Sequence, residues 1–254
     1  MRNLLYFLSL LLLVSSCMTK KELVYMQNPN YKETTPTTHT TSFAVYKLQP
    51  NDVLSIKVLS VDPDMADMFN IVSPTNAFGM SDPGSMYLSG YTIDNEGFVN
   101  LPTVGKLKME GLTTSQSQDL IQRNLNRYIT DATVVVKLIS FKISILGDVK
   151  APGRYHIYND RANLLEGLSM AGDLTQGANR QNVKLIRQKG EQSEVVLLDL
   201  TDPNLVQSQY YYLMPNDVIY VEPRKTQLKR ENLVVVGVML SIVSTGVLLL
   251  NYLK

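Results

Sequence analysis

The hydrophobic positions divide this chain of 254 residues into two unbroken apolar runs at its ends and an alternating, strand-rich body between them. The first run, Leu4 to Val14, follows Arg2 and has the length of a secretory leader's core, which is too short to span a bilayer. The second run, residues 233–250, carries no charge, and as a helix it would rise about 27 Å, close to the hydrocarbon thickness of a membrane. The pattern predicts a leader over residues 1–16, and a charged collar with a transmembrane helix over residues 224–254.

The only cysteine of the chain stands directly after this leader. Val14, Ser15 and Ser16 precede Cys17, and an apolar residue, two small residues and a cysteine resemble the bacterial lipobox. In such signals the thiol takes a diacylglycerol and cleavage leaves the cysteine as the new N-terminus. Cys17 is therefore the predicted lipid attachment site, with an ordinary leader and an incidental cysteine as the alternative. Stable anchoring by lipid takes two signals, and the C-terminal run would add one.

Small residues recur within the C-terminal run at every fourth position, as Gly237, Ser241 and Thr245. This spacing puts them on one helix face, where a neighbouring helix can approach closely, so they are the predicted helix-helix contact. The alternative is that small residues are simply common in membrane helices. The run is apolar nearly all round, whereas a helix that lines a wet pore should be amphipathic. Whether this helix lines a pore or only anchors the chain stays open, as does its orientation.

Between the two runs, the periodicity predicts two small α+β domains, over residues 46–140 and 141–223, after a polar, threonine-rich tether over residues 17–45. In the first domain we expect a strand at 53–58, a long loop at 62–89, a hairpin from 91 to 101 that turns at 94–97, and a strand at 132–139. Between the hairpin and the last strand we expect a helix. It starts in a capping box of Thr113 and Gln116, and its apolar face consists of Leu120, Ile121, Leu125 and Tyr128. In the second we expect strands at 142–146, 154–158, 183–187 and 194–200, and a helix that begins after Asn163 and ends at Gly172.

A short sequence motif occurs once in each of the two predicted domains. The segment 48–58 reads LQPNDVLSIKV and the segment 213–223 reads LMPNDVIYVEP, so that a Pro-Asn-Asp turn feeds an apolar strand in each copy. Proline presets φ and the side chains of Asn and Asp close such turns. The predicted turn residues are Pro50, Asn51, Asp52, Pro215, Asn216 and Asp217. The two aspartates could instead form a pair of catalytic acids, which would need carboxylates about 5–10 Å apart across a cleft. The turn role is the favoured interpretation, and no catalytic residue is predicted.

Composition and charge exclude several classes of protein. Removal of residues 1–16 takes away only Arg2, which leaves 23 basic residues against 23 acidic ones and no long basic run, so nucleic acid is not an expected partner. One cysteine allows no internal disulfide and no cysteine-based zinc site. The two histidines, His39 and His156, lie far apart in sequence and are expected to be structural or solvated. No metal or cofactor is predicted.

Four segments carry a resemblance to a known family. They read YKLQPNDVLSIKV from Tyr46, GYTIDNEGFVNLPTVGKLKMEGLT from Gly90, ILGDVKAPGRYHI from Ile145 and NLLEGLSMAGDL from Asn163. In this order, and after a lipobox, they resemble the Wza-type outer-membrane polysaccharide export proteins. In that family a polysaccharide-export domain precedes the soluble-ligand-binding β-grasp (SLBB) module. This chain departs from the best-known pattern because it has one recognisable β-grasp module rather than several.

The resemblance implies a lipid-anchored outer-membrane protein with most of its chain in the periplasm. It implies a ring of identical copies that conducts capsular or extracellular polysaccharide to the surface, together with an inner-membrane polysaccharide co-polymerase and its tyrosine-kinase-like partner. Two other interpretations stay open at this stage: a monomeric envelope lipoprotein that binds glycan through the β-grasp fold without transporting it, and a glycan hydrolase. Tyr210, Tyr211 and Tyr212 are candidates for glycan contact, with strand packing as the alternative. The polymer's chemistry and the number of subunits are not predicted.

Overall fold

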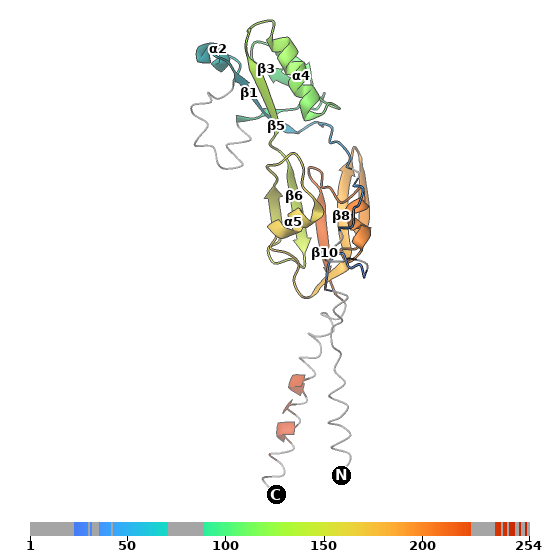
Figure 1. The fold of residues 1–254 in the computed structure, drawn as a ribbon. Helices are drawn as coiled ribbons and strands as arrows, with labels where there is room; N and C mark the ends of the chain where they lie inside the picture. The colour runs from blue at the N-terminus through green and yellow to red at the C-terminus, as the bar shows by residue number, and fades with distance from the viewer. Residues whose placement is uncertain are drawn as a thin grey trace.

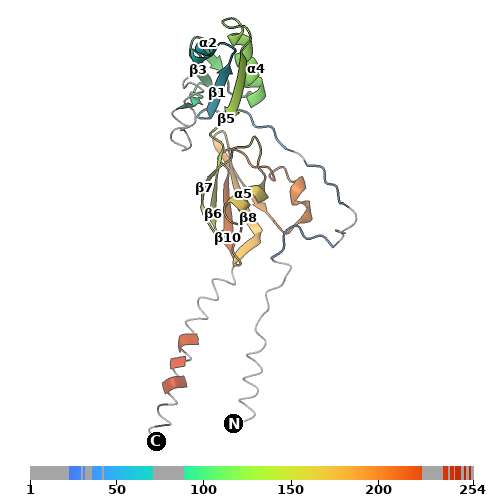
Figure 2. The same ribbon diagram turned by 60° about the vertical axis from the view of Figure 1, so that its left-hand side comes forward.

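A computed structural model of the chain describes residues 23–29, 31, 36–41, 43–70 and 89–224, and in the C-terminal run 237–239, 241–242, 244–246, 249 and 252. The predicted leader, Cys17 and most of the charged collar lie outside the described residues. The described chain forms two α+β domains stacked end to end, which we call the first domain (residues 46–140) and the second domain (residues 141–224) (Figures 1 and 2). Each domain has its own hydrophobic core.

The first domain is built on a three-stranded antiparallel sheet with the order β2-β1-β5, beside a separate β3-β4 hairpin. Its elements are β1 (Val53–Leu59), α2 (Pro63–Asp67), β2 (Tyr91–Thr92), β3 (Phe98–Leu101), β4 (Gly105–Lys108), α4 (Thr114–Leu125) and β5 (Thr133–Leu138). The strand predicted at 53–58 and the strand predicted at 132–139 are therefore confirmed, and they lie side by side.

Helix α4 begins as its sequence predicts. The Thr113 side chain accepts a hydrogen bond from the Gln116 backbone N–H, and the Gln116 side chain accepts one from the Thr113 N–H. This capping box satisfies two donors that the first helical turn leaves unpaired. Ile121 and Leu125 then turn their side chains into the core. The helix ends before Tyr128, whose side chain is exposed, so the predicted apolar face stops one turn earlier than expected.

Two predictions for the first domain were wrong. The strand at 91–92 does not pair with the strand at 98–101 as a hairpin, because β2 pairs with β1 while β3 pairs with β4. The reason is that Ile93 exchanges backbone hydrogen bonds with Asn51 and Asp52, which continues the β1 ladder and separates β2 from β3. The segment predicted as a loop from 62 also begins with helix α2, whose first turn is capped by the Asp62 carboxylate.

The second domain contains a five-stranded mixed sheet with the order β7-β6-β10-β8-β9. Its elements are β6 (Lys142–Gly147), β7 (Gly153–His156), α5 (Leu164–Met170), β8 (Ala178–Lys189), β9 (Gln192–Leu198), the 3₁₀ helix η3 (Pro203–Gln207) and β10 (Val218–Pro223). β10 lies between β6, with which it is parallel, and β8, with which it is antiparallel. β10 thus holds the two halves of the sheet together.

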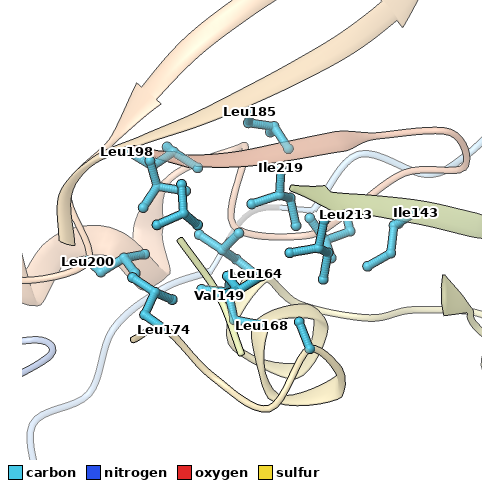
Figure 3. Packing of buried hydrophobic residues seen from close by; sticks show 14 of the residues in the cluster. Ile143, Val149, Leu164, Leu168, Leu174, Leu185, Leu198, Leu200, Leu213 and Ile219 are labelled. Carbon is cyan, nitrogen blue, oxygen red and sulfur yellow. The ribbon is translucent and has the colours of Figure 1, made fainter. Parts of the chain in front are cut away.

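One face of this sheet is covered by α5. Asn163 and Glu166 form the predicted capping box, and the helix ends at Ala171 with Gly172 in a left-handed conformation. Leu164 and Leu168 point from α5 toward the sheet, where they meet Ile219 and the neighbouring Leu213 (Figure 3). Since every fourth residue of the short helix is apolar, α5 shields this face from water.

Candidate functional site

The two Pro-Asn-Asp turns have the same local geometry. Asn51 and Asn216 both adopt a left-handed backbone, with φ of 71° and 66°. Asparagine tolerates this conformation better than most residues. In each turn an aspartate Oδ2 accepts a hydrogen bond from the backbone N–H three residues earlier, at 2.9 Å for Asp52 and 2.7 Å for Asp217. The two carboxylates therefore close the turns that the repeated Pro-Asn-Asp motif predicts.

The two aspartates differ in the side chains that they contact. Asp217 makes a bidentate ion pair with Arg187, from Nε to Oδ1 at 2.9 Å and from Nη2 to Oδ2 at 2.7 Å, and both side chains are buried. Asp52 accepts hydrogen bonds from the hydroxyl groups of Tyr46 at 2.8 Å and of Ser140 at 3.3 Å. Burial raises the pKa of Asp52, and the hydrogen bonds that it accepts oppose this shift. One turn is thus built on a charged partner and the other on neutral ones.

Both turns close on the short connection between the domains. Ser140, whose hydroxyl reaches Asp52, also accepts a hydrogen bond from the Val53 N–H at 3.1 Å. On the other side, the Asn216 N–H donates to the Lys142 carbonyl at 2.7 Å. Leu138 packs against both hydrophobic cores. The repeated motif therefore holds the joint between the domains, and its carboxylates are engaged in structural bonds rather than presented as an acid-base pair.

The three tyrosines that were candidates for glycan contact have different surroundings. The Tyr210 hydroxyl donates to Glu194 at 2.6 Å, and its ring lies 5.6 Å from the Arg187 guanidinium. Tyr210 and Tyr211 pack against the core of the second domain. Tyr212 contacts Tyr211 edge to face, with ring centroids 5.4 Å apart. Packing accounts for the first two residues, and glycan contact by Tyr212 stays a prediction.

The described parts of the predicted tether contact the second domain. The Met26 and Gln27 N–H groups donate to the carbonyl groups of Leu200 and Thr201, at 2.9 and 2.8 Å. Tyr25 packs against the core of the second domain, and its hydroxyl donates to Asp173. Residues 23–29 therefore form a docked segment on the domain that lies furthest from them in sequence.

The last residues of the second domain lie at the same end as this docked segment. Arg180 stacks over the Tyr25 ring at 5.5 Å, and its Nη1 donates to the Ala178 carbonyl at 3.4 Å. Arg224, the last residue described before the collar, donates from Nε to that same Ala178 carbonyl at 3.0 Å. Both ends of the folded body thus meet around Ala178, opposite the first domain (Figure 1). No signal in the sequence predicted this meeting, because it depends on contacts about 150 residues apart.

Removal of one hydroxyl tests how this segment is held. We expect Tyr25→Phe to speed hydrogen exchange at the Met26 and Gln27 amides about tenfold, because a net hydrogen bond contributes about 1–1.5 kcal/mol. Burial, followed by the hydrogen bond to Asp173, raises the pKa of Tyr25 above its usual value near 10. The hydroxyl's contribution is therefore complete below pH 10 and is lost as pH rises through the folded-state pKa. Equal exchange rates in Tyr25→Phe and the exposed control Tyr31→Phe would contradict this assignment.

The predicted helix-helix contact is only partly described. Gly237, Ser241 and Thr245 are helical and exposed, and the Thr245 hydroxyl donates to the Ser241 carbonyl at 2.8 Å. In the portion of the chain that the structure describes, no helix combines the length and the apolar character needed to cross a membrane. Over that same portion, no three side chains of His, Cys, Asp or Glu come together as a metal site.

Comparison with known proteins identifies both domains. Residues 41–139 match the polysaccharide biosynthesis/export proteins, and residues 141–221 match the SLBB domain. The chain therefore contains a polysaccharide biosynthesis/export domain followed by an SLBB domain. The family that the first domain matches is one of export proteins and not of enzymes. The resemblance of the four sequence segments is confirmed.

Two relatives of this chain carry the same name, EPS I polysaccharide export outer membrane protein EpsA. The protein from Ralstonia solanacearum is 26% identical over 186 residues, which are 71% of this chain and 48% of the relative. The protein from Ralstonia nicotianae is 27% identical over 153 residues, which are 56% of this chain and 38% of the relative. The chain thus spans about half the length, or less, of the curated relatives it matches.

Proposed function

We propose that this chain is an outer-membrane lipoprotein that assembles into an oligomeric conduit for capsular or extracellular polysaccharide. The polymer would pass from the periplasm to the cell surface, delivered by an inner-membrane polysaccharide co-polymerase and its tyrosine-kinase-like partner. The family and the names of the two Ralstonia relatives support export at the outer membrane. No chemical step is assigned to the chain itself.

One observation carries the proposal: the docked segment 23–29 and Arg224 lie at the same end of the second domain. The docked segment begins six positions after Cys17, and the apolar run at 233–250 begins nine positions after Arg224. Extended chain spans about 3.3–3.6 Å per residue, so these links reach at most about 20 and 30 Å. A lipid on Cys17 and the apolar run would therefore enter one and the same membrane.

This arrangement would also fix the orientation of the whole molecule. With both attachments at one end, the first domain stands at the far end of the folded body (Figure 2). The joint held by the Asp52 and Asp217 turns keeps the two domains in line. Copies anchored in this way would stand parallel, with their first domains at the same depth of the periplasm. Parallel copies at a common height are what a closed ring requires.

Deletion of the gene in its own bacterium tests the function. We expect surface polysaccharide to disappear and polymer to accumulate in the periplasm, since the conduit's loss leaves synthesis intact. The wild-type chain should restore export and Cys17→Ser should not, because one of the two membrane attachments is gone. Surface polysaccharide that persists at normal amounts in the deletion strain would refute the proposal. A monomeric glycan-binding lipoprotein, the other interpretation, would give no cross-linked multimers in membranes.

A further inference from the structure

The second domain has one sheet face that α5 does not cover, and most of the side chains on this face are apolar. Alternation along the strands puts two rows of side chains on it. One row runs through Val195, Ile186 and Val218, and the other through Leu197, Lys184, Tyr220 and Leu146, by the pairing of β9, β8, β10 and β6. At the ends of these rows, Val195 is 59%, Leu197 62% and Leu146 45% exposed. These side chains are therefore not covered by any of the described residues. We call these residues the open face.

The composition of β10 explains why this face differs from an ordinary solvated one. A sheet with one wet side alternates apolar and polar residues, whereas strands buried on both sides read as continuous apolar runs. β10 begins Val-Ile-Tyr-Val before Glu222 and Pro223, with Ile219 and Val221 buried in the core and Val218 and Tyr220 on the open face. This sequence is typical of a strand that is covered on both sides. A contiguous exposed apolar patch with a polar margin marks an interaction surface.

The chemistry of the open face favours a protein as its occupant. Five of its six apolar side chains are aliphatic, and a hydroxyl-rich glycan buried there would leave hydroxyl groups without hydrogen-bond partners. The face lies along the side of the domain and not at the end where Arg224 and the docked segment meet, so a membrane that receives both attachments would not cover it. Within the second row, Lys184 pairs with Glu222, so that one ion pair lies among the apolar side chains.

The opposite side of the same domain offers a complementary surface. The outer side of α5 carries Met170, which is 41% exposed, together with Leu165 and the exposed Glu166. The strands at one margin of the open face carry Lys142 and Arg154 on its side of the sheet. The open face thus has an apolar centre with basic side chains at one margin. The outer side of α5 has an apolar side chain beside an acidic one. Opposite charges across an interface fix the register of two partners.

We propose that the open face of one copy packs against the outer side of α5 in the next copy. This inference rests on the proposed function in one respect, because two attachments at one end would hold copies parallel in one membrane and bring these sides to the same height. A contact between two different surfaces is heterologous and generates a ring when its rotation closes. A contact of the open face with itself would stop at a pair of copies. The second domain is therefore assigned as the part that joins neighbouring subunits.

Cysteine cross-linking of the full chain in membranes tests the contact. We expect a double variant with Val195→Cys and Met170→Cys to give a ladder of disulfide-linked multimers on oxidation. A control with Val61→Cys and Met170→Cys should give none, since Val61 is 92% exposed but lies in the first domain. If Val195→Cys alone gives dimers and the double variant gives no ladder beyond them, the open face pairs with itself and the proposal is wrong.

Charge placed on the open face provides the second measurement. Val195→Asp combined with Leu197→Asp should reduce the detergent-extracted oligomer to monomer and leave the thermal unfolding of the chain unchanged, because both side chains are exposed. Val61→Asp is the matched control and should stay assembled. An assembled and export-competent double variant would overturn the contact but not the conduit. A wild-type chain that is monomeric in membranes would overturn both, whereas variants of the open face that stay assembled and lose only glycan binding would overturn the contact alone.

Discussion

Replacement of Asp217 by asparagine is expected to cost the second domain about 3–5 kcal/mol of its free energy of unfolding, because it leaves the Arg187 guanidinium charged and buried without a full partner. The aspartate offers two acceptor oxygens, one to Arg187 Nε and one shared by Nη2 and the Met214 N–H. Asparagine keeps the shape but turns one acceptor into a donor. One N–H group of Arg187 or of Met214 would then face another donor.

The other copy of the turn supplies the control. Asp52 meets the hydroxyl groups of Tyr46 and Ser140, either of which can accept as well as donate. Asp52→Asn should therefore cost less than about 1 kcal/mol. Hydrogen exchange of β6 and β10 in the full chain measures the first variant, and exchange of β1 measures the second. Costs within 1 kcal/mol of each other would show that the charge of Arg187 does not distinguish the two turns.

The pH dependence of the Asp52 variant follows from the same contacts. Burial raises the pKa of Asp52 above its value in the unfolded chain, which is near 4. Between these two pKa values the folded state binds more protons, so this group lowers stability as pH rises through that window. Asp52→Asn cannot lose a proton there. We expect the stability of the variant relative to wild type to improve as pH rises from 4 through the folded-state pKa.

A double variant removes both partners of the ion pair. Arg187→Met combined with Asp217→Asn should be more stable than Asp217→Asn alone, since the unpaired buried charge is gone and the aliphatic side chain can occupy its space. If the double variant is less stable than the single one, then packing of the Arg187 stem and its contact with Tyr210 contribute more than its charge. The comparison separates the loss of the pair from the cost of the charge left behind.

The local signals in the sequence predicted most of the elements around these sites. The capping boxes at Thr113 and Asn163 and the left-handed Gly172 depend on residues within one turn of each other, and the structure contains all three. The α+β class followed from the same short-range patterns. Arg187 was predicted on a strand, but its role was missed. Its position two residues after Leu185 on the buried side of β8 was the available signal, because a buried basic residue requires an acidic partner.

What the sequence could not predict depends on long-range contacts. β2 was assigned to β3 because a turn links them, whereas its hydrogen bonds go to β1, some 40 residues away. Tyr25 stands in a polar stretch that reads as a tether, and only its contact with Asp173 places it on the second domain. The open face was likewise not visible, since it requires the registers of four strands at once. The composition of a segment does not determine which distant segment covers it.

A second large effect is expected at Gly147, the last residue of β6. Its φ is +89°, and a Cβ atom built on it would lie 2.0 Å from the Val221 carbonyl oxygen. That oxygen accepts the Asp148 N–H at 2.9 Å, beside the parallel β6-β10 pairing. Gly147→Ala would therefore combine left-handed strain with a clash against backbone that cannot rotate away, and β10 would have to move from β6. We expect a loss of about 3–5 kcal/mol.

Gly190 isolates the contribution of the clash. It also has a left-handed backbone, with φ of +59°, but nothing lies within 4 Å of the position that its Cβ would occupy. Gly190→Ala should cost only the backbone strain, about 1–2 kcal/mol, in the same domain. Thermal unfolding of the full chain, followed by circular dichroism, compares the two variants.

Because β10 leads directly to Arg224 and the end where both membrane attachments would leave, Gly147→Ala should also reduce export, and Gly190→Ala should not. Equal stability of the two variants would mean that β6 and β10 can separate at little cost, and that the sheet does not hold this end of the molecule in place.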